Sequence, residues 1–233
     1  MIRKKAIITG SSTGLGESLA IAFATNGYDL VIHGRNKDKL EKVSERIKAL
    51  GVACSQVLGD LMLSKTINLL ELEALRGGGS SVLVNNAADI LSAYGVPFED
   101  IDDTKIDKIL TTNLVSLIKL SRRIYKSFTR MGGGTIINMN SIVGLEFKET
   151  NILYGTTKWG LRGFTNSLAL EARKKNIRVK GVYLTRVKTR EEFTYGMDPD
   201  EVAQKIYEFY IGSNETELVL DGRPEEFKTN KYT

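Results

Sequence analysis

Residues 6–16 read Ala-Ile-Ile-Thr-Gly-Ser-Ser-Thr-Gly-Leu-Gly, a short apolar run followed by a glycine-rich turn. The apolar run predicts a buried β-strand, and a helical spacing of apolar residues begins at Gly14. Glycines let a backbone approach a phosphate, and a helix start offers it unpaired N–H groups. The spacing is Gly-x-x-x-Gly-x-Gly rather than the usual Gly-x-Gly-x-x-Gly. Taken alone, this turn also fits a plain connection between a strand and a helix.

Strands and helices alternate along the rest of the chain. Apolar runs predict strands at 6–9, 28–33, 52–58, 81–85, 135–140, 177–184 and 217–220. Helical spacing predicts helices at 14–26, 36–50, 64–76, 104–131, 153–175 and 199–210. Such alternation produces a parallel sheet that is covered by helices on both faces. We therefore expect an α/β fold in which residues 1–233 form a single-domain, Rossmann-type, doubly wound parallel sheet of about seven strands.

The composition excludes several classes of protein. Of 233 residues, 42% are hydrophobic, enough for one sizeable core. With one Cys, Cys54, and one His, His33, the chain can form neither an internal disulfide nor a zinc site with Cys or several His ligands, and we expect no metal. The small excess of 33 Lys and Arg over 28 Asp and Glu argues against a nucleic-acid partner. No apolar stretch approaches the roughly 20 residues of a membrane span, so we expect a cytoplasmic protein with no membrane partner.

The end of the second predicted strand favours one nicotinamide cofactor. An NAD site would place Asp or Glu there to bind the ribose hydroxyls, but this chain has Gly34 followed by Arg35. A guanidinium can pair bidentately with a 2′-phosphate. We therefore expect NADP, with NAD the less favoured cofactor; a solvated Arg that caps a loop is the alternative. His33, on the same strand, is expected to pack in the core rather than act in catalysis.

Tyr154 and Lys158 lie four positions apart on a predicted helix and so share one face. The free phenol has a pKa of about 10, and a neighbouring cation favours its charged form and lowers that value. A general acid works best when its pKa is near the operating pH. Ser141, at the end of the preceding strand, has a hydroxyl that could bind a substrate carbonyl oxygen. Pairs of this spacing are also common on protein surfaces, and a Ser there could simply cap the strand end.

Four motifs occur together in order: Thr9 to Gly16, Asn85-Asn86-Ala87-Ala88, Asn113, and Ser141 with Tyr154 and Lys158. On these motifs the sequence resembles the short-chain dehydrogenase/reductase family from Ala6 to about Thr189. The resemblance implies that Tyr154 protonates the carbonyl oxygen, Lys158 lowers its pKa and holds the nicotinamide ribose, and Ser141 orients the carbonyl. It also implies that Asn113 anchors a water that links Lys158 to solvent.

The resemblance implies a cofactor site as well. Asp60 and Leu61 would hold the adenine ring, Asn86 and Ala87 would line the cofactor cleft, and Thr189 would lie near the carboxamide or diphosphate. The expected cofactor residues are Gly10, Ser12, Thr13, Gly14, Leu15, Gly16, Arg35, Asp60, Leu61, Asn86, Ala87, Tyr154, Lys158, Val187 and Thr189.

The chain also departs from the family. Ala88 stands where the family usually has Gly, and Leu184-Thr185 stand where it usually has Pro-Gly. The substrate loop at 186–198 is short, and residues 228–233, without the family's common glycine-rich ending, are expected to fray. These differences leave the substrate open: a 3-oxoacyl thioester and a sugar or polyol fit equally well.

The sequence thus predicts an enzyme, an NADP-dependent oxidoreductase that interconverts a small-molecule ketone and a secondary alcohol. The alternative is a nucleotide-binding regulatory or scaffold protein of the same fold with weak or vestigial activity. The helix at 104–131 carries more apolar residues than one buried stripe needs, at Ile106, Ile109, Leu110, Leu114, Leu117 and Ile118. Together with the resemblance, this excess predicts a homodimer or homotetramer.

Overall fold

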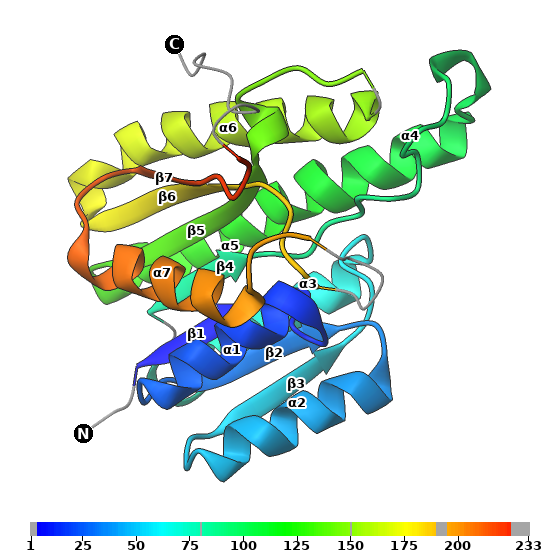
Figure 1. Cartoon of the computed structure of the whole chain (residues 1–233). Helices are drawn as coiled ribbons and strands as arrows, with labels where there is room; N and C mark the ends of the chain where they lie inside the picture. The colour runs from blue at the N-terminus through cyan, green and yellow to red at the C-terminus, as the bar shows by residue number, and fades with distance from the viewer. Residues whose placement is uncertain (1–3, 80, 150, 190–194, 225–233) are drawn as a thin grey trace.

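The computed structural model describes residues 4–79, 81–149, 151–189 and 195–224. The strands are β1 Lys5–Ile8, β2 Asp29–Gly34, β3 Cys54–Leu58, β4 Val82–Asn85, β5 Gly134–Ser141, β6 Ile177–Leu184 and β7 Glu217–Leu220. The α-helices are α1 Gly14–Thr25, α2 Lys37–Ala49, α3 Ser64–Leu75, α4 Asp103–Leu110, α5 Ser116–Met131, α6 Ile152–Ala172 and α7 Pro199–Gly212. The strands form one parallel sheet in the order β3-β2-β1-β4-β5-β6-β7 (Figure 1). The expected α/β, doubly wound fold is confirmed.

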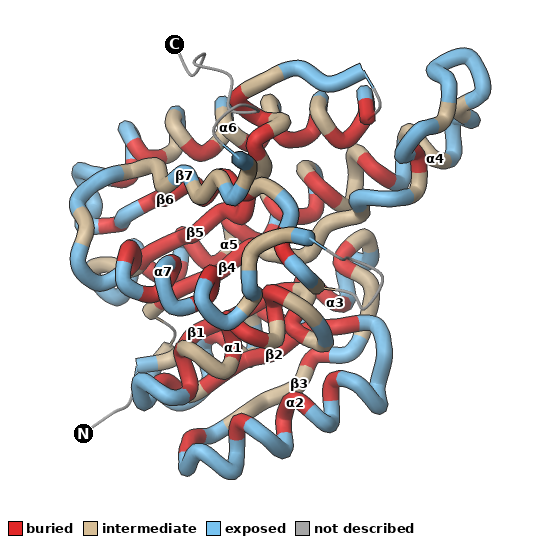
Figure 2. Tube along the Cα trace, in the orientation of Figure 1, coloured by how far each residue is buried: buried red, intermediate tan, exposed pale blue. Residues whose placement is uncertain are grey.

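Two hydrophobic clusters, one on each face of the sheet, make up most of the core. Helices α1, α2 and α7 pack over one face, and their apolar side chains join one cluster around Phe23 and Ile206. Helices α3, α5 and α6 cover the other face, around Leu70, Phe128 and Ala172. Figure 2 shows the central strands buried and the outward helix faces exposed. Because both faces are covered, the central strands read as continuous apolar runs rather than as alternating ones.

The predicted helix at 104–131 differs from the observed one in its interior. Helix α4 passes into a π-helical turn over Thr111–Val115 and continues as α5. Ser116 donates its N–H to the carbonyl of Thr111, one residue further back than in an α-helix. The turn contains Asn113, whose side chain binds the loop after β4 and not its own helix. Apolar spacing does not reveal such an interruption, because the residues on either side keep a helical repeat.

The strand register brings the ends of β5, β6 and β7 into one line. Ser141 pairs with Leu184, and Leu184 pairs in turn with Leu220. At the other half of the sheet, the strand order reverses between β1 and β4, which are neighbours. Ligands of doubly wound sheets bind beyond the carboxyl ends of the strands at this reversal. The chains that leave β1, β4, β5 and β6 there carry the motifs singled out above.

Candidate active site

The glycine-rich turn after β1 is closely packed against the end of β4. A Cβ atom on Gly16 would overlap the carbonyl oxygen of Gly10, and one on Gly10 would come within 2.9 Å of the Cα of Ala87. The Asn86 amide donates to the carbonyls of Thr9 and Gly10 at 3.0 and 3.1 Å. The Thr9 hydroxyl accepts from the backbone N–H groups of Asn86 and Ala87. Asn86 therefore fixes the turn rather than projecting freely into the cleft.

The start of helix α1 suits an anion. Its first residue is Gly14, and the Thr13 side chain before it makes no capping hydrogen bond. In α2, by contrast, the Asn36 side chain accepts the N–H of Lys39. The uncapped N–H groups and the positive end of the helix dipole at α1 are what a diphosphate needs. Ser12 and Leu15, expected in the same turn, flank this position, with Leu15 buried and Ser12 half-buried.

His33 is buried, as predicted, but it also holds the glycine-rich turn, which the sequence did not reveal. Its Nδ1 accepts the backbone N–H of Gly10 at 3.3 Å. Its Nε2 lies 3.0 Å from the carbonyl oxygen of Gly59, so Nε2 carries the proton. Burial is the main cause that lowers the pKa of His33, to about 4. The imidazole is therefore neutral at physiological pH and bridges the turn after β1 and the turn after β3.

Arg35 and Asp60 face each other where β2 and β3 end. The Arg35 Nη1 lies 3.8 Å from Asp60 Oδ2, and the Arg35 side chain is 69% exposed. A pair this exposed is weak, so the guanidinium can turn toward a ligand. Asp60 Oδ1 accepts the N–H of Met62, while Leu61 is buried beside it. The structure thus brings Arg35, Asp60 and Leu61 to one end of the cleft.

Ser141, Tyr154 and Lys158 come together at the carboxyl end of β5. Tyr154 and Lys158 lie on successive turns of α6, with the Lys158 Nζ 5.3 Å from the centroid of the Tyr154 ring. Lys158 Nζ donates to the carbonyl of Met139 at 2.8 Å. The Ser141 hydroxyl accepts the N–H of Val143, at the start of the 3-10 turn Ile142–Gly144. These contacts tie the helix and the strand end into one site.

The pKa of Tyr154 differs from the expectation. Burial raises it to about 12, and the group that lowers it is the Ser141 hydroxyl, through a hydrogen bond. Burial also lowers the pKa of Lys158 to about 8. The protein groups alone therefore leave the Tyr154 phenol protonated at neutral pH. Lys158 is not among the groups that shift the pKa of Tyr154, because burial dominates the pKa of both side chains.

Asn113 uses its whole side chain to hold the loop that follows β4. Its Oδ1 accepts the N–H of Asp89 at 2.6 Å, and its Nδ2 donates to the carbonyl of Asp89 at 2.8 Å. The side chain is 1% exposed. The side chain of Asn113 is thus engaged with Asp89, and its backbone lies in the π-helical turn. The water expected at Asn113 stays a prediction.

Val187 and Thr189 lie on the chain that leaves β6 and passes the start of α1. A Cβ atom on Gly14 would come within 2.8 Å of the Thr189 Cβ, so this chain lies directly over the start of α1. Val187 is buried and forms a bridge with Met197, which joins the two ends of the substrate loop. Of the loop predicted at 186–198, residues 190–194 lie outside the described residues, as does the tail at 228–233.

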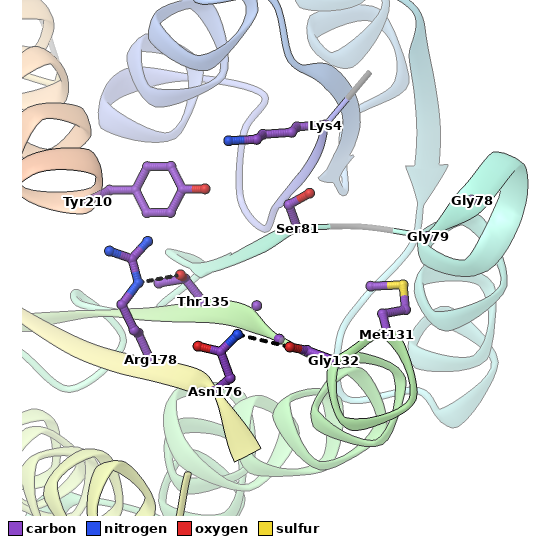
Figure 3. Close-up of a pocket in the computed structure, with 12 residues that line it drawn as sticks. Lys4, Gly78, Gly79, Ser81, Met131, Gly132, Thr135, Asn176, Arg178 and Tyr210 are labelled. Atoms are coloured by element: carbon purple, nitrogen blue, oxygen red, sulfur yellow. Dashed lines mark hydrogen bonds between the residues drawn. The ribbon is translucent and has the colours of Figure 1, made fainter. Parts of the chain in front are cut away.

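A pocket of about 530 Å³ lies at the opposite, amino edge of the sheet (Figure 3). Lys4, Arg178 and Tyr210 face it, and the Arg178 guanidinium donates to the Thr135 hydroxyl. The carboxyl end of α5 at Met131 also borders it, and helix carboxyl ends disfavour an anion. None of the predicted site residues lines this pocket. The candidate active site is the carboxyl edge of the sheet, where those residues converge.

Comparisons with known proteins agree with this geometry. Residues 4–195 match the family described as short chain dehydrogenase. The chain is 30% identical over 187 residues to a 3-oxoacyl-(acyl-carrier-protein) reductase, FabG, of Staphylococcus epidermidis, with 78% of this chain and 74% of that protein covered. A metagenomic short-chain oxidoreductase in complex with NADP has a similar structure: the TM-score is 0.84 and the identity 26%, and the match covers 95% of this chain and 98% of that one.

A short-chain dehydrogenase from Sphingobium yanoikuyae, in complex with NADPH, is similar at a TM-score of 0.82 and 26% identity, over 94% of this chain and 87% of that one. No helix among the described residues is both long enough and apolar enough to cross a membrane.

Proposed function

The chain belongs to the short-chain dehydrogenase family of oxidoreductases, and on this premise we propose that it is an NADP-dependent enzyme that interconverts a ketone and a secondary alcohol. The observation that carries the proposal is the meeting of Ser141, Tyr154 and Lys158 at the carboxyl edge of the sheet, beside an uncapped helix start. A scaffold protein would have no need to keep a buried phenol, a buried amine and a hydroxyl together there.

The residues of the cleft fit a nicotinamide dinucleotide that carries a 2′-phosphate. The turn from Gly10 to Gly16 and the start of α1 would hold the diphosphate. Arg35, exposed and only weakly paired, would bind the 2′-phosphate. Asp60 and Leu61 would contact the adenine, and Val187 and Thr189 the nicotinamide half. When bound, the cofactor supplies or accepts the hydride.

The protein groups supply orientation and the proton. Ser141 would donate a hydrogen bond to the substrate carbonyl oxygen and hold it beside Tyr154. Tyr154, protonated at neutral pH, would give its proton to that oxygen during reduction. Lys158 would bind the ribose, and its cation would stabilise the phenolate that remains. In the direction of alcohol oxidation the same phenolate would take the proton back.

The same proposal extends to the domain organisation, the substrate class and the oligomeric state. Residues 1–233 would be one dinucleotide-binding catalytic domain acting on a small carbonyl or alcohol, and not on nucleic acid. Helix α4 and its continuation leave Ile106, Leu110, Leu114 and Ile118 only half-buried within one chain. This remaining apolar surface supports a homodimer or homotetramer.

The function is tested with Tyr154→Phe. The wild-type protein should oxidise NADPH in the presence of a panel of ketones, and the variant should lose at least about 100-fold in kcat while its affinity for NADPH stays within about twofold. Tyr125→Phe is the matched control. It removes the phenol on α5 that donates to Glu171 of α6, far from Ser141 along the sheet, and its activity should equal that of the wild type.

Binding of NADPH without turnover of any ketone or alcohol in the panel would contradict the enzymatic proposal and favour the regulatory or scaffold alternative. Equal activity of Tyr154→Phe and wild type would contradict the assignment of Tyr154 as the proton donor.

A further inference from the structure

The segment after β7 reaches the catalytic edge of the sheet. Because Ser141, Leu184 and Leu220 pair across β5, β6 and β7, residues that follow Leu220 emerge about 10 Å from Ser141, two strand spacings away. Gly222 then donates its N–H to the Thr185 hydroxyl at 2.9 Å. Thr185 stands at one of the two positions where the family usually has Pro-Gly. Its hydroxyl therefore anchors the segment after β7 to the start of the substrate loop.

Arg223 lies between two carboxylates at this point. Its Nε and Nη2 donate to Asp221 over 2.7–3.1 Å, and its Nη1 donates to Glu146 Oε1 at 2.7 Å. The side chains of Arg223, Glu146 and Asp221 are 20%, 10% and 9% exposed. Hydrogen bonds between charged groups are stronger when water is largely excluded. This cluster is therefore a firm link rather than a loose surface pair.

Glu146 connects this cluster to the residue that would orient the substrate. Its backbone N–H donates to the carbonyl of Ile142 at 3.0 Å, which closes the turn after β5. The same turn begins with the N–H of Val143 bonded to the Ser141 hydroxyl. Three hydrogen bonds, joined through the backbone of Glu146 and of Ile142-Val143, thus link Arg223 to Ser141. Lys148 adds a second cation on Glu146 at 3.0 Å.

We propose that Arg223 is a positioning residue for the substrate side of the active site, holding the turn after Ser141 in the orientation that the carbonyl requires. The proposal rests on the proposed function of Ser141. Arg223 acts through Glu146 and does not itself bind the reacting atoms. The part of the cofactor site expected to hold the diphosphate, adenine and 2′-phosphate, at the ends of β1 to β3, lies on the other half of the sheet.

The test compares Arg223→Ala with wild type in steady-state kinetics and in hydrogen exchange. We expect kcat/KM for a ketone substrate to fall by about tenfold or more, mainly in kcat, because small misplacements of an orienting group are costly. The affinity for NADPH should stay within about twofold. The backbone N–H groups of Leu145 and Glu146, both bonded to Ile142, should exchange faster.

Arg123→Ala is the matched control. It also breaks an ion pair of Arg with Glu, at 2.6 Å between α5 and α3, but far from this turn, and neither readout should change. Arg223→Lys should restore part of the activity, since an ammonium can bind either carboxylate but lacks the fork that binds both. If Arg223→Ala does not fold, Glu146→Gln gives the same two readouts.

Unchanged kcat/KM in Arg223→Ala, whatever the exchange result, would overturn the proposal. If the wild type reduces no ketone, the proposed function fails instead. The exchange of Leu145 and Glu146 then decides the positioning role alone: faster exchange supports it, and unchanged exchange overturns it.

Discussion

The backbone N–H of Gly10 donates to the Nδ1 of His33 at 3.3 Å, so the only histidine of the chain holds the turn on which the cofactor phosphates are expected to rest. The bond requires a lone pair on Nδ1, which only the neutral imidazole offers here. Binding of the cofactor and stability of the fold should therefore both depend on the protonation of His33.

Acidification should destabilise the protein through His33. Its pKa is about 4 in the fold against 6.5 for the free side chain, so the unfolded chain binds a proton that the folded chain does not. The contribution of the neutral His33 to the free energy of unfolding is fully present above pH 6.5. It is lost as the pH falls toward 4, by up to about 3 kcal/mol. Urea unfolding at several pH values should show this loss in the wild type. In His33→Asn the free energy of unfolding should fall less between pH 6.5 and pH 4 than in the wild type. Identical pH profiles of this free energy in the two proteins would contradict the prediction.

Gly16→Ala should damage the cofactor site. The added methyl group overlaps the Gly10 carbonyl and the Asn86 amide, so the turn must shift, at a cost of about 1–3 kcal/mol. We expect a lower melting temperature and a loss of NADPH binding by fluorescence titration. Gly163→Ala is the control on α6, where a methyl group meets no atom within 4 Å. It should keep NADPH binding and gain slightly in stability. Normal binding by Gly16→Ala would show that the turn does not contact the cofactor.

Arg35 should select the cofactor. Arg35→Ala removes a charged partner of the 2′-phosphate, so the Kd for NADPH should rise by about 10- to 100-fold while that for NADH hardly changes. Arg46→Ala, an exposed arginine on α2 that pairs with Glu17, serves as control and should change neither Kd. Equal losses for both cofactors, or a wild type that prefers NADH, would rule out Arg35 as the selector.

The sequence predicted all seven strands and most helices in order, because each core strand is a compact apolar run and glycines such as Gly27, Gly51 and Gly132 follow helix ends. It did not predict the division of 104–131 into α4 and α5, because the π-helical turn keeps a helical repeat of apolar residues on both sides. It also predicted Tyr154 and Lys158 from their spacing on one helix, and Ser141 from its place at the end of a strand and from the resemblance. Apolar runs and residue spacing do not predict contacts between distant parts of the chain. The bond of His33 with Gly10 and that of Arg223 with Glu146, 77 positions apart, exist only once the sheet aligns its strand ends. The pKa of Tyr154 depends on how deeply the phenol is buried, and the spacing of residues on one helix does not reveal burial.

The segment from Asp221 to Arg223 has a practical consequence for anyone who purifies or immobilises this protein. A tag or carrier fused after Thr233 would be joined to the chain ten positions after Arg223, whose cluster borders the substrate side. A tag before Lys4 would instead be attached at the amino edge of the sheet, on the far side from the cleft (Figure 1). Attachment ahead of Lys4 therefore leaves the segment Asp221 to Arg223 and its contact with Glu146 unaltered.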